Sequence, residues 1–223
     1  MQLKLFTLFI FLVNCSFAVT ANNFKPQIGD LLFQDLDCGT LCNGINQVTH
    51  GVNNTYMSHV AMVYSIKSGN VMVVEAVSKG VILAPLDKFL SYSHDKNNNP
   101  MVIEERLKPQ YQYLIPKAII FTHNQLGKPY NSTFRPNKNK SFYCSSLIYQ
   151  AFMTANNGKP FFENHAMSFN DPQTGKITNA WQNYFQELHT TAPEGEIGTN
   201  PGMMSRSNKL VIVHAYGTLR THN

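Results

Sequence analysis

The residue best suited to chemistry in this chain is Cys144, which begins a segment with a helical pattern. Apolar residues follow it at intervals of three and four, on one face of a helix: Leu147, Ile148, Ala151 and Phe152. Unpaired main-chain N–H groups and the helix dipole stabilise a thiolate in the first turn. The pattern therefore predicts a nucleophilic cysteine, and its ordinary alternative is a small, unreactive core thiol.

A nucleophilic thiol needs a base, and the base needs a group that orients it. His59 and Glu75 lie in two β-rich runs, residues 58–66 and 71–77, which predict an antiparallel hairpin. A three-residue loop would place the two side chains diagonally on one face, about 7 Å apart, whereas a two-residue turn would place them on opposite faces. Taken singly, each residue has an ordinary alternative: His59 as a histidine in a turn, and Glu75 as a glutamate that faces outward from its strand. Together with Cys144 they predict a catalytic triad.

Acyl transfer also requires hydrogen-bond donors for the developing oxyanion. The main-chain N–H groups of Cys144 and Ser145 are the predicted donors. Gln34 is either a further donor or a plain polar residue at the end of a strand. Tyr130 and Tyr143 are candidates for the substrate pocket, although an aromatic residue after Gly-x-Pro is as often a packing residue.

The composition carries no signature of nucleic-acid binding. The chain has 223 residues, with 18 Lys and Arg against 13 Asp and Glu, and a formal net charge of +5. The basic residues are dispersed, without a Lys/Arg run or interleaved aromatic residues. We therefore expect no nucleic-acid partner.

The first 21 residues have the pattern of a cleaved secretory signal: a short charged start, an apolar run and small residues near its end. The run is too short to span a bilayer, and no other run reaches about 18 apolar residues, so we expect no transmembrane segment. Cys15 resembles a lipoprotein cysteine, but Asn14 stands where a small residue is required. We expect residues 22–223 to form a single domain that is secreted or periplasmic.

Cys38 and Cys42 could either form a disulfide or bind a metal ion. In an oxidising compartment, Cys38 and Cys42 are close enough to form a disulfide if the local geometry permits, which leaves Cys144 as the free thiol. The alternative is a zinc site with His50 and His59, but the irregular spacing lacks paired ligands. We expect no metal and no cofactor.

The remaining patterns predict an α+β fold in which an antiparallel sheet packs against helices. Residues 156–176 and 195–207 are predicted to lack regular structure. Strands are predicted at residues 29–34, 58–66, 71–77, 80–84, 100–107 and 210–213, and helices at residues 41–52, 85–90, 113–126, 144–152 and 177–188.

Several short motifs, taken in order, resemble the permuted papain-like amidases of the YaeF/YiiX group, relatives of the NlpC-type cysteine peptidases. The resemblance extends over residues 26–213. It implies a circularly permuted papain-like fold, a triad of Cys144, His59 and Glu75, and hydrolysis of amide bonds without a metal. The motifs are Gly29-Asp30-Leu31-Leu32-Phe33-Gln34, Ser58-His59, Val74-Glu75-Ala76, Gly127-Lys128-Pro129-Tyr130, Tyr143-Cys144-Ser145 and Gly198-Thr199-Asn200-Pro201-Gly202.

Two positions depart from the pattern of that family. An acidic residue often stands two positions after the cysteine, where this chain has Ser146, and Asp often follows the Pro-Tyr pair, where it has Asn131. Neither change removes a member of the triad. Both positions bear on substrate contacts.

Three functional hypotheses follow. The first is a secreted cysteine amidase or peptidase that acts on peptides or acyl conjugates, with cell-wall peptides as candidate substrates. The second is acyl transfer or hydrolysis on lipids, for which the sequence shows no apolar patch or amphipathic helix beside the site. The third is a non-catalytic binding module, and the joint presence of Cys144, His59 and Glu75 argues against it.

Overall fold

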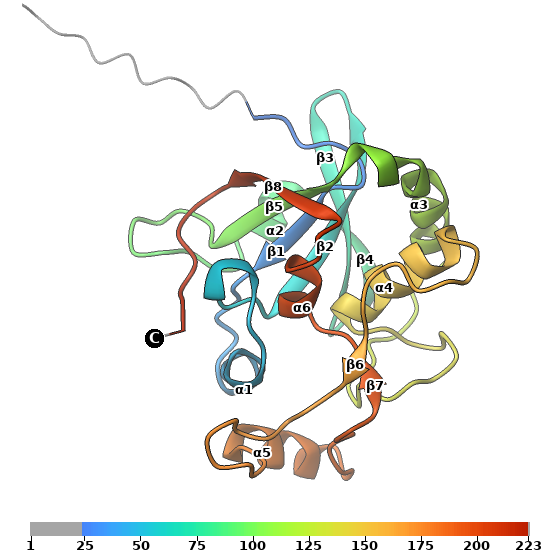
Figure 1. Ribbon diagram of the computed structural model, residues 1–223. Helices are drawn as coiled ribbons and strands as arrows, with labels where there is room; N and C mark the ends of the chain where they lie inside the picture. Colours follow the sequence, from blue (N-terminus) through green and yellow to red (C-terminus); the bar gives the residue numbers. More distant parts are fainter. Residues whose placement is uncertain (1–23, 223) are drawn as a thin grey trace, which may run out of the picture.

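The structure, a computed structural model, describes residues 24–222; the predicted signal at residues 1–21, with Cys15, lies outside the described residues. Six strands form one antiparallel sheet in the order β4-β3-β2-β1-β5-β8 (Figure 1). The first strand therefore lies inside the sheet. The strands are β1 (Leu31–Gln34), β2 (His59–Lys67), β3 (Asn70–Val77), β4 (Gly80–Pro85), β5 (Val102–Leu107) and β8 (Leu210–Ala215).

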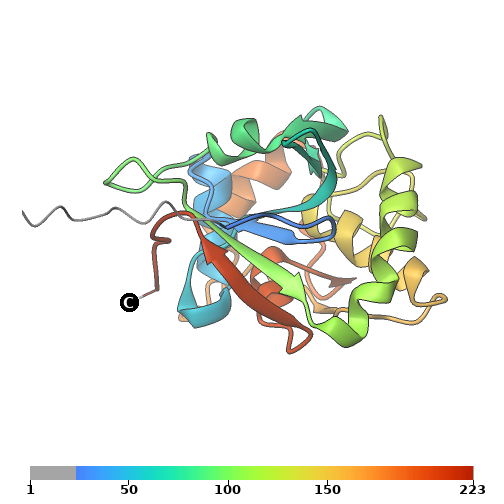
Figure 2. The same cartoon turned by 90° about the horizontal axis from the view of Figure 1, so that it is seen from above.

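Helices cover both faces of this sheet. Side chains alternate along β2, so Val60 and Met62 join the apolar cluster of α3 and α4, whereas Ala61 and Val63 join that of α2. Seen from above, α2 lies well apart from α3 and α4 (Figure 2). The helices are α1 (Thr40–Val48), α2 (Leu86–Leu90), α3 (Ile115–His123), α4 (Cys144–Ala155), α5 (Asn179–Glu187) and α6 (Pro201–Ser205), with 3-10 turns η1 (Val52–Asn54) and η2 (Pro109–Leu114).

The predicted α+β fold with an antiparallel sheet is confirmed, and the two segments predicted to be irregular are corrected. Residues 156–176 contain β6 (His165–Ala166), which pairs with β7 (Ile197–Gly198), and α6 follows β7. Strands of two residues are too short to show a period of two, and their pairing is decided by tertiary contacts. The start of α6 did carry a local signal, because Asn200 caps it and Pro201 stands at its first position.

The β2–β3 hairpin places His59 and Glu75 on one face by a route that the sequence did not predict. Its turn has two residues, Ser68 and Gly69, both with positive φ, as a tight hairpin turn requires. By itself that turn would put the two side chains on opposite faces. A β-bulge at Tyr64 shifts the register by one residue, and beyond it Met62 pairs with Val74. The bulge therefore brings the side chains of His59 and Glu75 onto the same face of the hairpin.

A third apolar cluster lies beside the sheet, between α1, α5 and the loop before α4. It is rich in aromatic rings: Phe134, Tyr143, Phe169, Trp181 and Phe185 are buried there with Met167. Leu41, Ile45 and Val48 of α1 pack against it. In Figure 1, α1 and α5 lie beyond the same end of the sheet, apart from its two covered faces. This cluster borders the N-terminus of α4 through Tyr143.

Within residues 24–222, none of the helices combines the length and the apolar character needed to cross a bilayer.

The carboxyl group of Glu105 generates a prediction about stability and pH. Its side chain on β5 is 1% exposed, and Oε1 has no hydrogen-bond partner among the described residues. Burial raises the pKa of Glu105 from 4.5 to about 8. The folded state therefore keeps a proton that the unfolded chain releases. The associated stability is full below the unfolded pKa and is lost as the pH rises through about 8.

We expect Glu105→Gln to change the free energy of unfolding differently at the two ends of this pH range. Relative to the unsubstituted protein, the variant should gain a few kcal/mol more stability at about pH 8 than at about pH 4, to order of magnitude. Urea unfolding of both proteins across this range measures the difference, in which contributions from other titrating groups cancel. A pH-independent difference would show that Glu105 titrates normally.

Candidate active site

His59 and Glu75 form a buried pair across the β2–β3 hairpin. His59 Nε2 lies 2.7 Å from Glu75 Oε2, and the two residues are 4% and 0% exposed. The other carboxylate oxygen accepts a hydrogen bond of 3.1 Å from the Tyr92 hydroxyl, just after α2. The imidazole stacks on Phe89 at a centroid distance of 5.8 Å. Glu75 and Phe89 therefore both hold the ring in position.

Gln34 supports this arrangement from behind and does not line the cavity beside Cys144. It pairs with His59 in the β1–β2 ladder, is 0% exposed, and its Nε2 donates to the main-chain oxygen of Phe89 at 3.2 Å. The hypothesis that Gln34 donates to an oxyanion is therefore wrong for this structure. Its side chain anchors Phe89, on which the imidazole stacks.

Cys144 is the first residue of α4, and Ser146 organises the helix start. The Ser146 hydroxyl accepts a hydrogen bond from the Tyr143 N–H at 2.9 Å and donates to the Tyr143 carbonyl at 2.8 Å. The first main-chain bond of the helix runs from Leu147 N–H to the same carbonyl. The N–H groups of Cys144 and Ser145 precede it and have no acceptor within the helix. They are available to an oxyanion at the positive end of α4.

The Cys144 side chain, 7% exposed, makes a hydrogen-bonding contact with His59. Because His59 Nε2 is hydrogen-bonded to Glu75, Nδ1 is the ring nitrogen left to contact the sulfur. Burial alone would lower the pKa of His59, but the hydrogen bonds and charges of Cys144 and Glu75 outweigh it. Together they raise the pKa from 6.5 to about 10. The geometry therefore favours a charged imidazolium between a sulfur and a carboxylate.

The segment before α6 closes the site on its other side, through a residue that the sequence reasoning did not single out. The Ser145 hydroxyl donates to the Thr199 carbonyl at 3.1 Å, and the Thr199 N–H donates to the Tyr143 hydroxyl at 3.3 Å. Thr199 lines the cavity, and its own hydroxyl is buried without a partner among the described residues. Its only sequence signal was its place in the run 198–202.

Tyr130 and Tyr143 both line the cavity beside Cys144. Burial raises the pKa of Tyr143 to about 12 and that of Tyr130 well above 10. Both phenols are therefore neutral at physiological pH. The Tyr143 ring also packs against Phe134, at a centroid distance of 5.4 Å, so it belongs to the aromatic cluster as well.

The cavity has a volume of about 550 Å³, and His59, Cys144 and Ser145 form part of its wall. The rest of the wall comes from α1, the β3–β4 turn, β6 and its flanks, Phe134, Trp181 and residues 199–201. Pockets of this size commonly bury most of a small ligand. The arrangement can therefore hold a substrate against the sulfur and exclude water around it.

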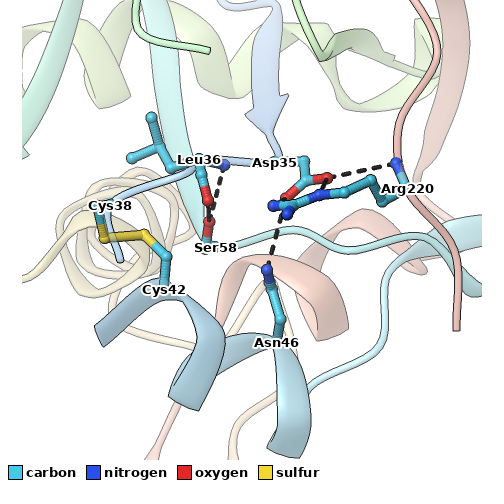
Figure 3. The surroundings of a disulfide bond; sticks show 7 residues. All are labelled: Asp35, Leu36, Cys38, Cys42, Asn46, Ser58 and Arg220. Atoms are coloured by element: carbon cyan, nitrogen blue, oxygen red, sulfur yellow. Dashed lines mark hydrogen bonds and ion pairs between the residues drawn. A yellow bond between two sulfur atoms is a disulfide. The ribbon is translucent and has the colours of Figure 1, made fainter. Parts of the chain in front are cut away.

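Cys38 and Cys42 form a disulfide, which ties the start of α1 to the chain leaving β1 (Figure 3). Both cysteines line the cavity. Beside them, the Ser58 hydroxyl accepts the Leu36 N–H at 2.9 Å, which joins this segment to the residue before His59. With both sulfurs bonded to each other, neither is a thiolate for zinc, and the alternative zinc site is wrong for this structure.

A second tie lies next to the disulfide in Figure 3. Asp35 is 0% exposed, and both its carboxylate oxygens accept hydrogen bonds from the Arg220 guanidinium, at 2.8 and 2.6 Å. Asn46 of α1 donates to the same carboxylate at 3.5 Å. The C-terminal segment and α1 are thus both tied to the end of β1.

The fold and this geometry were compared with known proteins. The family model of the permuted papain-like amidase enzymes, YaeF/YiiX, C92 family, matches residues 25–214. The chain belongs to this family. A search of curated proteins gives no match. Membership indicates an amidase or peptidase of the papain-like type, and it confirms the resemblance proposed from the sequence.

One similar solved structure is the crystal structure of yiiX from Escherichia coli O157:H7, described as a metalloprotein. The identity is 21%, the TM-score is 0.67, and the match covers 87% of this chain and 99% of the other. At this identity the likeness shows the fold alone. It confirms the predicted circularly permuted papain-like architecture.

The two positions that depart from the family pattern have local structural partners. Ser146 caps α4, as described above. The Asn131 side-chain amide donates to the Arg135 carbonyl at 2.8 Å, and its oxygen accepts the Thr133 hydroxyl at 3.0 Å. Both residues shape the loop and helix that carry Cys144.

The contact between sulfur and imidazole can be tested by titrating His59. In Cys144→Ala the imidazole loses a hydrogen-bond partner and a charge, while burial remains. We therefore expect the pKa of His59 to fall from about 10 toward or below 6.5. Nitrogen-detected NMR of the imidazole measures it. An unchanged pKa in Cys144→Ala would show that the two side chains do not interact.

Proposed function

We propose that this protein is a secreted cysteine hydrolase that cleaves amide bonds in peptides or acyl conjugates, with Cys144 as nucleophile, His59 as base and acid, and Glu75 as orienting group. One observation carries the proposal. A cysteine at the N-terminus of α4 contacts an imidazole whose far nitrogen lies 2.7 Å from a buried carboxylate, in the wall of a cavity. This arrangement has the parts that thiol-based acyl transfer needs.

In the first half of the reaction, the Cys144 thiol gives its proton to His59, and the thiolate attacks the carbonyl carbon of the substrate. Negative charge develops on the carbonyl oxygen, where the N–H groups of Cys144 and Ser145 stabilise it. The C–N bond then breaks. His59 returns its proton to the departing amine, and the acyl group remains on sulfur as a thioester.

In the second half, a water molecule attacks the thioester while His59 accepts its proton. The C–S bond breaks, a carboxylic acid leaves, and the thiol is restored by the proton held on His59. Glu75 keeps the imidazole in one orientation and stabilises its charged form throughout. The Tyr92 hydroxyl, bonded to Glu75 at 3.1 Å, positions the carboxylate.

The proposed compartment is outside the cytoplasm. The signal-like residues 1–21 support it, as does the Cys38–Cys42 disulfide, because disulfides persist mainly in oxidising compartments. A periplasmic or secreted amidase would meet peptides and acyl conjugates of the cell envelope. Cell-wall peptides remain candidate substrates.

The structural neighbour yiiX is described as a metalloprotein, which raises the question of a metal here. Among residues 24–222, no group of three or more His, Cys, Asp or Glu side chains is arranged to hold a metal ion. The side chains of the described part of the chain therefore do not fit a resident metal.

Alkylation of Cys144 tests the proposed nucleophile. We expect iodoacetamide to modify Cys144 rapidly, because the imidazole of His59 and the helix N-terminus stabilise the attacking sulfur. His59→Ala should suppress this reactivity at low pH. Mass spectrometry of the modified peptide measures the rate. His123→Ala is the matched control, since that histidine bonds to Tyr64 and does not line the cavity.

Turnover of simple acyl substrates tests the catalysis. With p-nitrophenyl acetate and p-nitroacetanilide, we expect Cys144→Ala to abolish turnover. His59→Ala should reduce kcat by on the order of 100- to 10,000-fold, the usual contribution of general acid–base catalysis. An unreactive Cys144, together with the absence of any turnover that depends on it, would instead favour a non-catalytic binding module.

A further inference from the structure

A second cleft lies next to the cavity of the proposed active site, on the polar face of α4. It has a volume of about 360 Å³ and is bounded by that face, by the loop 131–142 and by residues 197–199. Phe134, Tyr143 and Thr199 line both the cavity and the cleft, so they form a shared wall. The members of the proposed triad do not line the cleft. The reaction proposed above therefore makes no use of it.

The wall of this polar cleft is rich in hydrogen-bonding groups and has no negative charge. Of the described residues that line it, none is Asp or Glu, whereas Arg135 and Lys138 are cationic. Amide side chains both donate and accept hydrogen bonds. Those in the wall are Asn131, Asn137, Asn139, Gln150 and Asn164. A ligand in the cleft therefore meets donors, acceptors and positive charge.

The two cations of the polar cleft differ in what they offer a ligand. The Arg135 guanidinium forms an ion pair with Glu196 and donates to the Thr191 carbonyl at 2.9 Å. Lys138 is exposed and forms no ion pair with any other described residue. The ammonium of Lys138 is therefore the positive charge left for a ligand.

Uncommitted hydrogen-bonding groups share the wall with this ammonium. The side chains of Gln150 and Asn139 make no hydrogen bond to another residue in the described part of the chain. The Tyr149 hydroxyl accepts the Asn164 amide at 3.0 Å and keeps its own hydrogen for a further acceptor. An ammonium, amide N–H groups and a phenol O–H together form a donor set that suits a carboxylate.

The loop that carries Lys138 is held in place by its neighbours. Lys128 Nζ donates to the Asn139 carbonyl at 2.7 Å, and the Asn137 side-chain oxygen accepts the Lys140 N–H at 3.2 Å. These contacts fix Lys138 at a φ of 54°, which side chains other than glycine rarely adopt. A wall that is ordered before binding lowers the entropy cost of binding.

We propose that the polar cleft binds the carboxylate of a small polar ligand, with Lys138 as counter-charge and Gln150, Asn139 and Tyr149 as hydrogen-bonding partners. One free ammonium balances a single negative charge. A phosphate dianion would need a second free cation, and Arg135 is already paired with Glu196. The inference goes beyond the hydrolase function and does not depend on it, because binding requires no turnover.

The charge of the ligand is the first experimental variable. A peptide terminus and an acidic sugar both carry such a carboxylate, and N-acetylalanine and glucuronate represent them. We expect the better of these acids to bind the full-length protein about 3- to 5-fold more tightly than its uncharged counterpart, N-acetylalaninamide or glucose, since an exposed ion pair contributes up to roughly a 5-fold gain. The acid with the larger preference identifies the source of the carboxylate.

Titrations followed by NMR of the amide groups measure these affinities and locate the ligand. We expect saturable shift changes at Lys138, Asn139 and Gln150, and a smaller preference for the acid at high salt. Equal affinities within both pairs, or no saturable binding of either acid, would overturn the proposal. Shift changes at His59 and Cys144 in place of the cleft would overturn it as well.

A matched pair of lysines tests the counter-charge. Lys138 lines the cleft, whereas Lys140 is exposed on the same loop and does not. We expect Lys138→Gln to lower the affinity for the acid to that of its uncharged counterpart, and Lys140→Gln to keep the preference. Equal effects of the two substitutions would attribute the preference to the net charge of the protein and contradict a site at Lys138.

An added carboxylate tests the wall formed by α4. Gln150→Glu places a negative charge in the cleft, whereas Gln182→Glu makes the same change on the exposed face of α5, outside it. We expect Gln150→Glu to weaken binding of the acid by about 5-fold or more, because like charges repel, and Gln182→Glu to leave it unchanged. Unaltered binding in Gln150→Glu would show that the carboxylate does not occupy this cleft.

Discussion

The contact of 2.7 Å between His59 and Glu75 is the interaction on which the rest of this site depends. Both side chains are almost completely buried, so neither charge is stable there without the other. Removing one member of such a buried pair typically costs roughly 3–5 kcal/mol, because the other is left uncompensated. The pair therefore contributes to the stability of the fold as well as to the proposed chemistry.

Four features outside the pair support it. The bulge at Tyr64 brings the two residues onto one face of the hairpin despite a two-residue turn. Beneath α2, Tyr92 donates to the second carboxylate oxygen, and Phe89 covers the imidazole ring. Gln34, paired with His59 across the ladder, holds Phe89 in place. The elements around the hairpin therefore act together to position one ring.

Cys144 reaches that ring from the opposite side of the sheet. Leu147, Ile148, Ala151 and Phe152 bury one stripe of α4 against β2 and β3, on the face away from α2. Because His59 is the first residue of β2, its imidazole lies at the end of the strand, where the start of α4 can approach it. The proposed triad lies on the sheet and α4, and His59 and Cys144 form one wall of the cavity. Much of the remaining wall comes from α1, Trp181 of α5 and the loops beside them.

The sequence by itself determined those features that arise from local patterns. The apolar spacing after Cys144 predicted α4, the two β-rich runs predicted the hairpin, and the ordered motifs indicated the family. It could not determine the register of the hairpin, since the bulge at Tyr64 reflects packing and carries no residue signature. Three features were decided only by the tertiary structure. They are the hydrogen bond of Gln34 to Phe89, the position of Thr199 beside Tyr143, and the set of residues that line the cavity. These depend on contacts between residues such as Tyr143 and Thr199, or Gly44 and Trp181, which are 56 and 137 positions apart. Periodicity reports which side of an element is apolar, but the partner of that side is chosen only when the whole chain has folded.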